Sequence, residues 1–126
     1  MIRFFSIVMI FLFSQASFAQ LESDLKLADH YYSQGEYDKA RPYYESVYKT
    51  NPSKIYLSRL LSCLEAEGDL KQAEKVLKKA KAKSPEDLDL KIQLAVFYEE
   101  HNATAKAKKA YESLLANFIV NPSKGI

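Results

Sequence analysis

The chain has little of what disulfide-bonded or loop-rich proteins use. Its 126 residues include three glycines, four prolines and one cysteine. A single cysteine excludes an intrachain disulfide and a four-cysteine zinc site, and so little glycine and proline argues against an all-β protein. Cys63 lies among leucines, so we interpret it as a small buried apolar residue; a reactive thiol or an intermolecular disulfide is the alternative.

Neither sign of charge is in clear excess. The sequence has 18 basic and 16 acidic residues, for a formal net charge of +2. A dedicated nucleic-acid-binding protein usually carries a marked basic excess, so no nucleic-acid partner is predicted. Hydrophobic residues make up 48% of the chain, which is enough for the core of one modest domain.

The common motifs of catalytic and cofactor sites are absent from the sequence. There is no glycine-rich phosphate loop, no H-E-x-x-H and no C-x-x-C. His30 and His101 lie far apart, without a partner at ligand spacing, and His101 is better explained as a helix cap. Glu99 and Glu100 are adjacent, so on a helix they diverge by about 100°. We therefore predict no catalytic, cofactor-binding or metal-binding residues and no enzymatic activity.

The first nineteen residues have the three-part pattern of a secretory signal peptide. Arg3 supplies a positive charge, Phe4 to Phe13 is almost wholly apolar, and residues 14–19 are mostly small or polar. We predict cleavage after Ala19. The alternative is an uncleaved anchor, but ten apolar residues give only about 15 Å of helix against a hydrocarbon core of about 30 Å. The mature chain is thus expected to be exported, periplasmic or secreted, without a stable membrane span.

The remaining chain repeats at a period of 33 to 34 residues, over about 21–53, 54–87 and 88–121. Each repeat has a turn residue, then an alanine five positions later, then a large residue four positions after that. Gly35, Gly68 and Asn102 are residues that accept the left-handed conformation in which helices end. The repeated positions hold Ala28, Tyr31, Gly35, Ala40 and Tyr44; then Leu61, Leu64, Gly68, Ala73 and Leu77; then Ala95, Tyr98, Asn102, Ala107 and Tyr111.

Turn residues and helix caps predict six helices. Ser53 and Ser84 are the expected N-caps after the breaks at Pro52 and before Pro85. The small alanines allow two helices to approach closely, and the large residue one turn later fills the gap between hairpins. The predicted helices span residues 22–34, 36–50, 54–67, 69–82, 86–100 and 103–118.

This pattern resembles the tetratricopeptide repeat family, whose unit has a small residue three before an aromatic, then A-x3-F, then Pro. The first repeat matches with Ala28-x2-Tyr31, Ala40-x3-Tyr44 and Pro52, and the likeness covers residues 21–121. It departs from the family where Leu61 replaces a small residue and Ile119 replaces proline. The resemblance implies an all-α fold, a right-handed α-solenoid of three stacked helix-turn-helix hairpins over residues 20–126, and a scaffold that binds other proteins.

In that family the first helices of successive hairpins line a concave groove that holds a peptide or helix. The resemblance places seven residues in such a groove; an unused solvent-facing surface is the alternative. One subfamily of these repeat proteins grips the C-terminal carboxylate of its partner with basic residues on several helices. Only Arg59 among the seven residues is basic, so that kind of binding is not predicted here. The seven groove residues are Asp29, Tyr32, Ser33, Arg59, Ser62, Val96 and Glu99.

Tyrosine is concentrated in the first repeat. Tyr31, Tyr37 and Tyr44 fall at repeat positions and are predicted to be core. Tyr32, Tyr43 and Tyr48 are not explained by the repeat; partial burial is one account. The other is exposure, for contact with a protein or for stacking on a glycan or peptidoglycan, which gives a ligand-binding module as the alternative function.

Two surface features leave further alternatives open. The stretch from Lys71 to Lys83 holds six lysines, and we interpret it as a solvated helix face, with contact to an anionic surface as the alternative. Near the end, Phe118, Ile119 and Val120 would be left partly bare. Either two copies or a partner meet there, or the chain is the N-terminal part of a longer array, because residues 121–124 repeat the sequence of residues 51–54.

Overall fold

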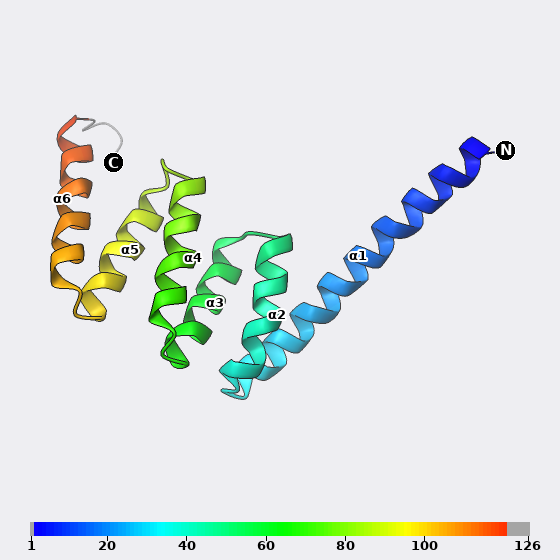
Figure 1. The fold of residues 1–126 in the computed structure, drawn as a ribbon, viewed down its shortest axis with the longest axis horizontal. Coiled ribbons are helices and arrows are strands. Elements are labelled where there is room, and N and C mark those ends of the chain that lie inside the picture. Colours follow the sequence, from blue (N-terminus) through cyan, green and yellow to red (C-terminus); the bar gives the residue numbers. More distant parts are fainter. Residues whose placement is uncertain (1, 121–126) are drawn as a thin grey trace. The chain divides into compact units, whose positions relative to one another are not determined.

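A computed structural model of the chain describes the backbone of residues 2–120 and the side chains of residues 17–120. Over that range the ordered elements are all α-helices (Figure 1), which confirms the all-α helical-repeat class. Five of the six helices lie within two residues of their predicted bounds. The helices are α1 Ile2–Ser33, α2 Tyr37–Thr50, α3 Lys54–Ala66, α4 Leu70–Lys83, α5 Leu88–Glu100 and α6 Thr104–Val120.

The start of the first helix was predicted wrongly. A start at residue 22 was expected, yet α1 is continuous from Ile2. The first glycine is Gly35 and the first proline is Pro42, so nothing in the first thirty-three residues interrupts a helix. The side chains of residues 1–16 lie outside the described residues, and the predicted cleavage after Ala19 stays a prediction.

The same turn ends the first helix of each repeat. Gly35 and Gly68 have φ of 74° and 75°, and Asn102 has φ of 58°, as the sequence predicted. In each case the following backbone N–H donates to a carbonyl five residues earlier: Glu36 to Tyr31 at 2.9 Å, Asp69 to Leu64 at 2.9 Å, and Ala103 to Tyr98 at 2.8 Å. This is the Schellman arrangement, which satisfies the carbonyls that a helix end leaves unpaired.

Of the two predicted N-caps, one is right and one is wrong. Ser53 caps α3, because its side chain accepts a hydrogen bond from the Tyr56 backbone N–H at 3.3 Å. Ser84 does not cap α5; the N-cap is Asp87, whose carboxylate accepts from the Leu90 N–H at 3.3 Å. The Asp87 N–H donates to the Ser84 carbonyl at 3.0 Å, so Ser84 instead opens a turn with Pro85 at the second position, where proline is favoured.

The chain divides into two compact units. In the first, formed by α1 to α3 with the turn up to Asp69, α1 packs on α2 and α2 packs on α3. A polar link crosses the first hairpin: Asp24 is 8% exposed and accepts hydrogen bonds from Ser46 and Gln20, both at 2.8 Å. The buried hydrophobic residues are Ala28, Ala40, Tyr44, Val47, Leu57, Leu60, Leu61, Cys63 and Leu64.

Cys63 is buried, as predicted. Burial raises the pKa of its thiol to about 11, so the reactive thiolate is scarce near neutral pH. Tyr44 is core as predicted, but Tyr31 and Tyr37 are only half-buried. The Tyr31 ring stacks beside the Tyr43 ring, with 6.0 Å between the ring centroids, rather than entering the core.

The second unit consists of α4 to α6, in which α4 packs on α5 and α5 packs on α6. The core thins along α6, where Ala107 and Leu114 are the buried residues of the helix. Within the described part of the chain, no helix combines the length and the apolarity needed to cross a membrane. The buried hydrophobic residues of this unit are Ala73, Leu77, Ala80, Leu90, Leu94, Ala95, Phe97, Tyr98, Ala107 and Leu114.

Replacing Gly68 tests the turn. A Cβ at Gly68 would meet no atom within 4 Å, so the cost of Gly68→Ala comes from the positive φ alone, and we expect about 1 kcal/mol of destabilisation. Gly68→Asn should cost less, because asparagine tolerates this conformation and already occupies it at Asn102. Urea unfolding measures both variants; a Gly68→Ala variant as stable as the parent would contradict the strain argument.

Candidate partner-binding site

Three of the predicted groove residues lie together in the first unit, on α1 and α3. The guanidinium of Arg59 lies 4.4 Å from the centroid of the Tyr32 ring. The Tyr44 hydroxyl of α2 donates to Asp29 at 2.6 Å, and the Tyr44 ring meets that of Tyr32 edge-on at 5.8 Å. We call Asp29, Tyr32 and Arg59 the Arg59 surface. Since its supports come from three helices, its geometry depends on how α1, α2 and α3 pack.

The electrostatics of the Arg59 surface follow from these contacts. Burial, followed by the hydrogen bond to Asp29, raises the pKa of Tyr44 above its usual value, so the phenol stays a neutral donor. The hydrogen bond with Tyr32 raises the pKa of Arg59, which remains a cation. Arg59 and Asp29 are exposed and Tyr32 is half-buried. An exposed guanidinium held over an aromatic ring suits a carboxylate or a carbonyl of a bound peptide.

Of the other four groove residues, two share the first unit but make different contacts, and two belong to the second unit. Ser33 and Ser62 lie on α1 and α3, but their hydroxyls donate to the carbonyls of His30 and Ser58, at 2.7 and 3.0 Å, on their own helices. Val96 and Glu99 belong to α5 of the second unit. Val96 is exposed, and Glu99 accepts a hydrogen bond from Tyr111 at 2.6 Å, which raises the pKa of the Tyr111 phenol.

Tyr32, Tyr43 and Tyr48, which the repeat pattern did not explain, are half-buried. This agrees with the prediction of partial burial. Arg59 covers one ring, that of Tyr32. Tyr31 stacks on the ring of Tyr43. Burial raises the pKa of Tyr48. Since stacking on a sugar needs an open ring face, these contacts favour a structural role for the tyrosines over a glycan site.

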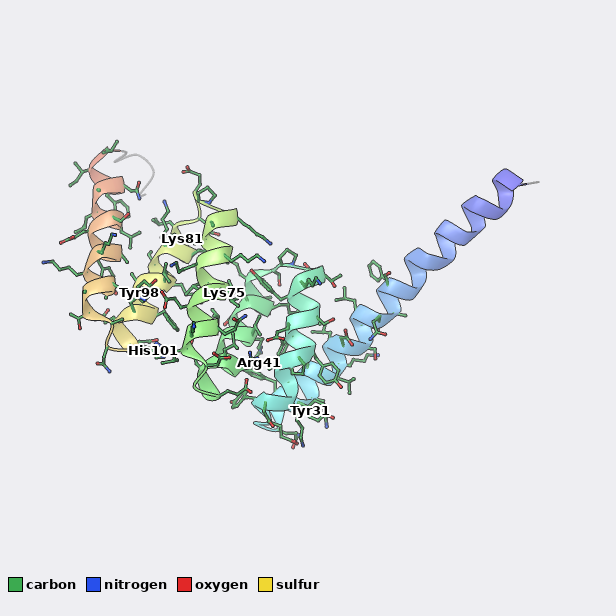
Figure 2. All side chains as sticks on the ribbon, viewed as in Figure 1. Tyr31, Arg41, Lys75, Lys81, Tyr98 and His101 are labelled. Carbon is green, nitrogen blue, oxygen red and sulfur yellow. The ribbon has the colours of Figure 1, made fainter. Side chains whose placement is uncertain are left out.

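Arg41 on α2 joins three carboxylates of the first unit (Figure 2). Its guanidinium lies 2.9 Å from Glu45, 3.3 Å from Glu67 and 3.1 Å from Asp69. The Arg41 side chain is 25% exposed, and its hydrogen bonds raise its pKa above the usual value. This network ties α2 to the turn after α3 and so stabilises the unit that carries the Arg59 surface.

A second charged cluster, in the second unit, was not found from the sequence. Glu74 on α4 accepts hydrogen bonds from Lys106 on α6 at 2.9 Å and from the hydroxyl of Tyr98 on α5 (labelled in Figure 2) at 2.9 Å. Lys106 also lies 5.3 Å from the Tyr98 ring centroid. The bond from Lys106 lowers the pKa of Glu74, while burial raises the pKa of Tyr98 to about 12. In the sequence, the one feature that could have indicated this cluster is that Glu74 is the single acidic residue among the lysines of α4.

The end of α6 is apolar and exposed, as the sequence predicted. Leu115, Phe118, Ile119 and Val120 are 61%, 38%, 81% and 76% exposed. Burying such residues is favourable by roughly 1.5–3 kcal/mol each. The segment of residues 121–126, in which the start of another repeat was predicted, lies outside the described residues.

The remaining histidines and the potential metal ligands among the described residues have local structural roles or form no metal-binding group. No group of three His, Cys, Asp or Glu side chains with metal-binding geometry occurs among residues 17–120. His30 packs edge-on against Tyr31 at 5.5 Å. His101 is the C-cap of α5, with its Nδ1 2.7 Å from the Phe97 carbonyl, as expected for a capping residue.

Comparison with protein families gives two overlapping matches. Both models are described as tetratricopeptide repeat, and they match residues 25–87 and 64–118. The first covers half of the chain. No match is found among curated proteins. The two matches together take in every helix of both units, apart from the N-terminal part of α1 and the last two residues of α6.

Replacing Glu74 tests the cluster on α4. Glu74→Gln removes the charge that Lys106 pairs with, and we expect a loss of less than about 1 kcal/mol, because the pair is partly solvated. The folded state lowers the pKa of Glu74, so this contribution is full above the unfolded pKa and is lost as the pH falls through the folded pKa. The stability gap between parent and variant should therefore shrink in acid.

The control for Glu74→Gln is Glu112→Gln. Glu112 is 3.9 Å from Lys108, and its side chain is 63% exposed, so its loss should change the free energy of unfolding by no more than about 0.5 kcal/mol. Urea unfolding at several pH values measures both variants. Equal effects of the two, or a gap that widens in acid, would show that Glu74 is not a stabilising carboxylate.

Proposed function

Because the chain belongs to the tetratricopeptide repeat family, we propose that it is an exported protein-interaction scaffold that holds a partner peptide or helix against the Arg59 surface. The observation that carries this proposal is the contact of Arg59 with Tyr32 beside Asp29. Aromatic rings and arginines are the residues that most often dominate binding at protein interfaces. The hydrogen bond and ring contact of Tyr44 hold Asp29 and Tyr32 in place, which reduces the entropy lost on binding.

The partner that suits this surface is a peptide or helix with mixed polarity. Arg59 offers a cation to a carboxylate, Asp29 offers an acceptor to a basic group, and Tyr32 offers an apolar ring edge. Two adjacent groups of opposite charge also fix the direction in which a peptide lies, because the reversed peptide would place like charges together. Catalysis is no part of the proposal, since the repeats of this family typically serve as scaffolds.

Export is supported by the pattern of residues 1–19 alone. The positive charge of Arg3, the apolar run and the small residues up to Ala19 stand in the order that is typical of a secretory signal peptide. Outside the cytoplasm the lone thiol of Cys63 would meet oxidising conditions. Its burial suits that environment, because a buried thiol is protected from oxidation.

The apolar end of α6 supports a further part of the proposal, namely that this end is covered. Either a further repeat of a longer array or a second copy of the chain would bury Phe118, Ile119 and Val120. These residues are distinct from those of the Arg59 surface, which lie on α1 and α3.

The Arg59 surface is tested by capture of the partner. The mature chain, tagged at its C-terminus, is crosslinked in its native compartment, and bound proteins are identified. Arg59→Ala should weaken binding of the captured partner by about tenfold, which corresponds to about 1.4 kcal/mol for a central interface arginine. Lys49→Ala is the matched control, because it removes an exposed cation from α2 of the same unit.

The outcomes of this experiment separate the two parts of the proposal. Loss with Arg59→Ala and not with Lys49→Ala supports binding at the Arg59 surface. Equal binding by all three chains would place the partner elsewhere. Recovery of no macromolecule by the parent chain would count against a scaffold altogether.

Export is tested by the mass of the mature protein. Expressed with its own N-terminus in an exporting host, the chain should be recovered outside the cytoplasm with Gln20 as its first residue. Ala19→Arg should block cleavage, because the peptidase requires small residues at this position. Intact-mass measurement reads both results, and a full-length chain from the parent sequence would contradict cleavage after Ala19.

A further inference from the structure

The lysines of α4 form a basic surface that the proposed function does not use. The helix Leu70–Lys83 carries six lysines and one glutamate. Five of the lysines are exposed, and Lys81 is half-buried (Figure 2 labels Lys75 and Lys81). We call the five exposed residues the lysine stripe: Lys71, Lys75, Lys78, Lys79 and Lys83.

Helix geometry places the stripe along one side of α4. At about 100° per residue, its five lysines fall within an arc of about 140°, and at about 1.5 Å per residue they extend over about 18 Å. The opposite side of the helix carries Ala73, Leu77 and Ala80, which are buried. The packing of α4 in its unit therefore fixes which way the stripe faces.

The described part of the chain supplies no ion-pair partner to the stripe lysines, although the charge of Lys78 acts on Glu74. Elsewhere Lys26, Lys39 and Arg41 pair with carboxylates of the first unit, and Lys106 and Lys108 pair with carboxylates of the second. No ion pair involves a stripe lysine among the described residues. The one acid of α4, Glu74, is taken by Lys106 and the Tyr98 hydroxyl.

The arrangement is unfavourable to the isolated helix. Lys71, Lys75 and Lys79 follow one another at i, i+4 spacing, and like charges at that spacing destabilise a helix. An external row of carboxylates would remove this repulsion and would form several ion pairs at once. An acidic partner would therefore relieve the cost of this charge pattern.

We propose that the lysine stripe docks an acidic polypeptide segment of a partner protein. The inference extends the proposed scaffold function by naming the chemistry of one partner and by giving it a surface on α4, which includes none of Asp29, Tyr32 and Arg59. A segment about 18 Å long corresponds to some twelve helical or about five to six extended residues. Rows of Glu or Asp along such a segment match the row of lysines.

The make-up of the stripe favours a narrow polypeptide over a broad polyanion. It contains no exposed aromatic or large apolar residue that could enter a bilayer or stack on bases. It also contains no arginine, the residue suited to bidentate phosphate contacts.

The test is binding of a fluorescent poly-L-glutamate peptide of about 20 residues, long enough to span the stripe. Anisotropy is measured with the full chain at low and physiological salt. The triple variant Lys71→Gln, Lys75→Gln, Lys79→Gln should bind about tenfold more weakly, since each exposed ion pair contributes little and three act together. Glutamine keeps helix propensity, and circular dichroism checks the fold.

The matched control is Lys91→Gln, Lys108→Gln, Lys109→Gln, which removes the same charge from α5 and α6 of the same unit. Weaker binding by the stripe variant alone, lost at high salt, supports the inference. Equal weakening by both triple variants would overturn it, because net charge would then explain the binding. Absence of binding by the parent chain would overturn it too.

Vesicles with anionic lipid and a single-stranded DNA of about 20 nucleotides complete the panel. If either binds through the stripe at physiological salt while poly-L-glutamate does not, the occupant is a membrane or a nucleic acid and the inference fails. The stripe and Arg59 variants are assayed separately with the captured partner. If Arg59→Ala weakens binding of the captured partner and the stripe variant does not, the stripe proposal is contradicted and the scaffold function is still supported.

Discussion

Close approach of the paired helices is the constraint on which the rest of the structure depends. In the first hairpin Ala28 of α1 and Ala40 of α2 are both fully buried, and in the last hairpin Ala95 of α5 and Ala107 of α6 are buried as well. A side chain larger than methyl at these positions would push the helix axes apart. Because the helices lie close, Tyr44 can reach Asp29 across the hairpin and Ser46 can reach Asp24. The position and polarity of the Arg59 surface thus follow from a packing requirement.

Hydrogen bonds that cross between helices give each unit its particular surface. Arg41 joins α2 to the turn at Glu67 and Asp69, and Glu74 joins α4 to Lys106 of α6. Each such pair contributes little when solvated, but each also decides which charges remain available to a partner. Arg41 is neutralised within its unit. Arg59 is exposed and contacts Tyr32 rather than a carboxylate, and the stripe on α4 keeps its charge because its one acid is engaged elsewhere.

Local signals in the sequence predicted the turns and most of the helices correctly. Gly35, Gly68 and Asn102 adopt positive φ, since the physical reason for their presence is local to the backbone. Ser53 is an N-cap for the same kind of reason. Ser84 was assigned wrongly because two acceptors, Ser84 and Asp87, compete within four residues around Pro85, and the turn geometry favours the second. The start of α1 was predicted wrongly because it was placed just after the predicted cleavage site at Ala19. No helix-breaking residue lies there, and the helix runs through it.

The sequence by itself determined the repeat, the all-α class, the burial of Cys63 and Tyr44, and the exposed apolar end of α6, because each depends on periodicity or on a residue's own backbone preference. Only the tertiary structure decided that Tyr31 and Tyr37 stay half-buried, that Arg59 lies over Tyr32, and that Glu74 pairs with Lys106, thirty-two residues away. These contacts join side chains from different helices. Their formation depends on the spacing and rotation of the helices, which packing sets and which no local pattern encodes.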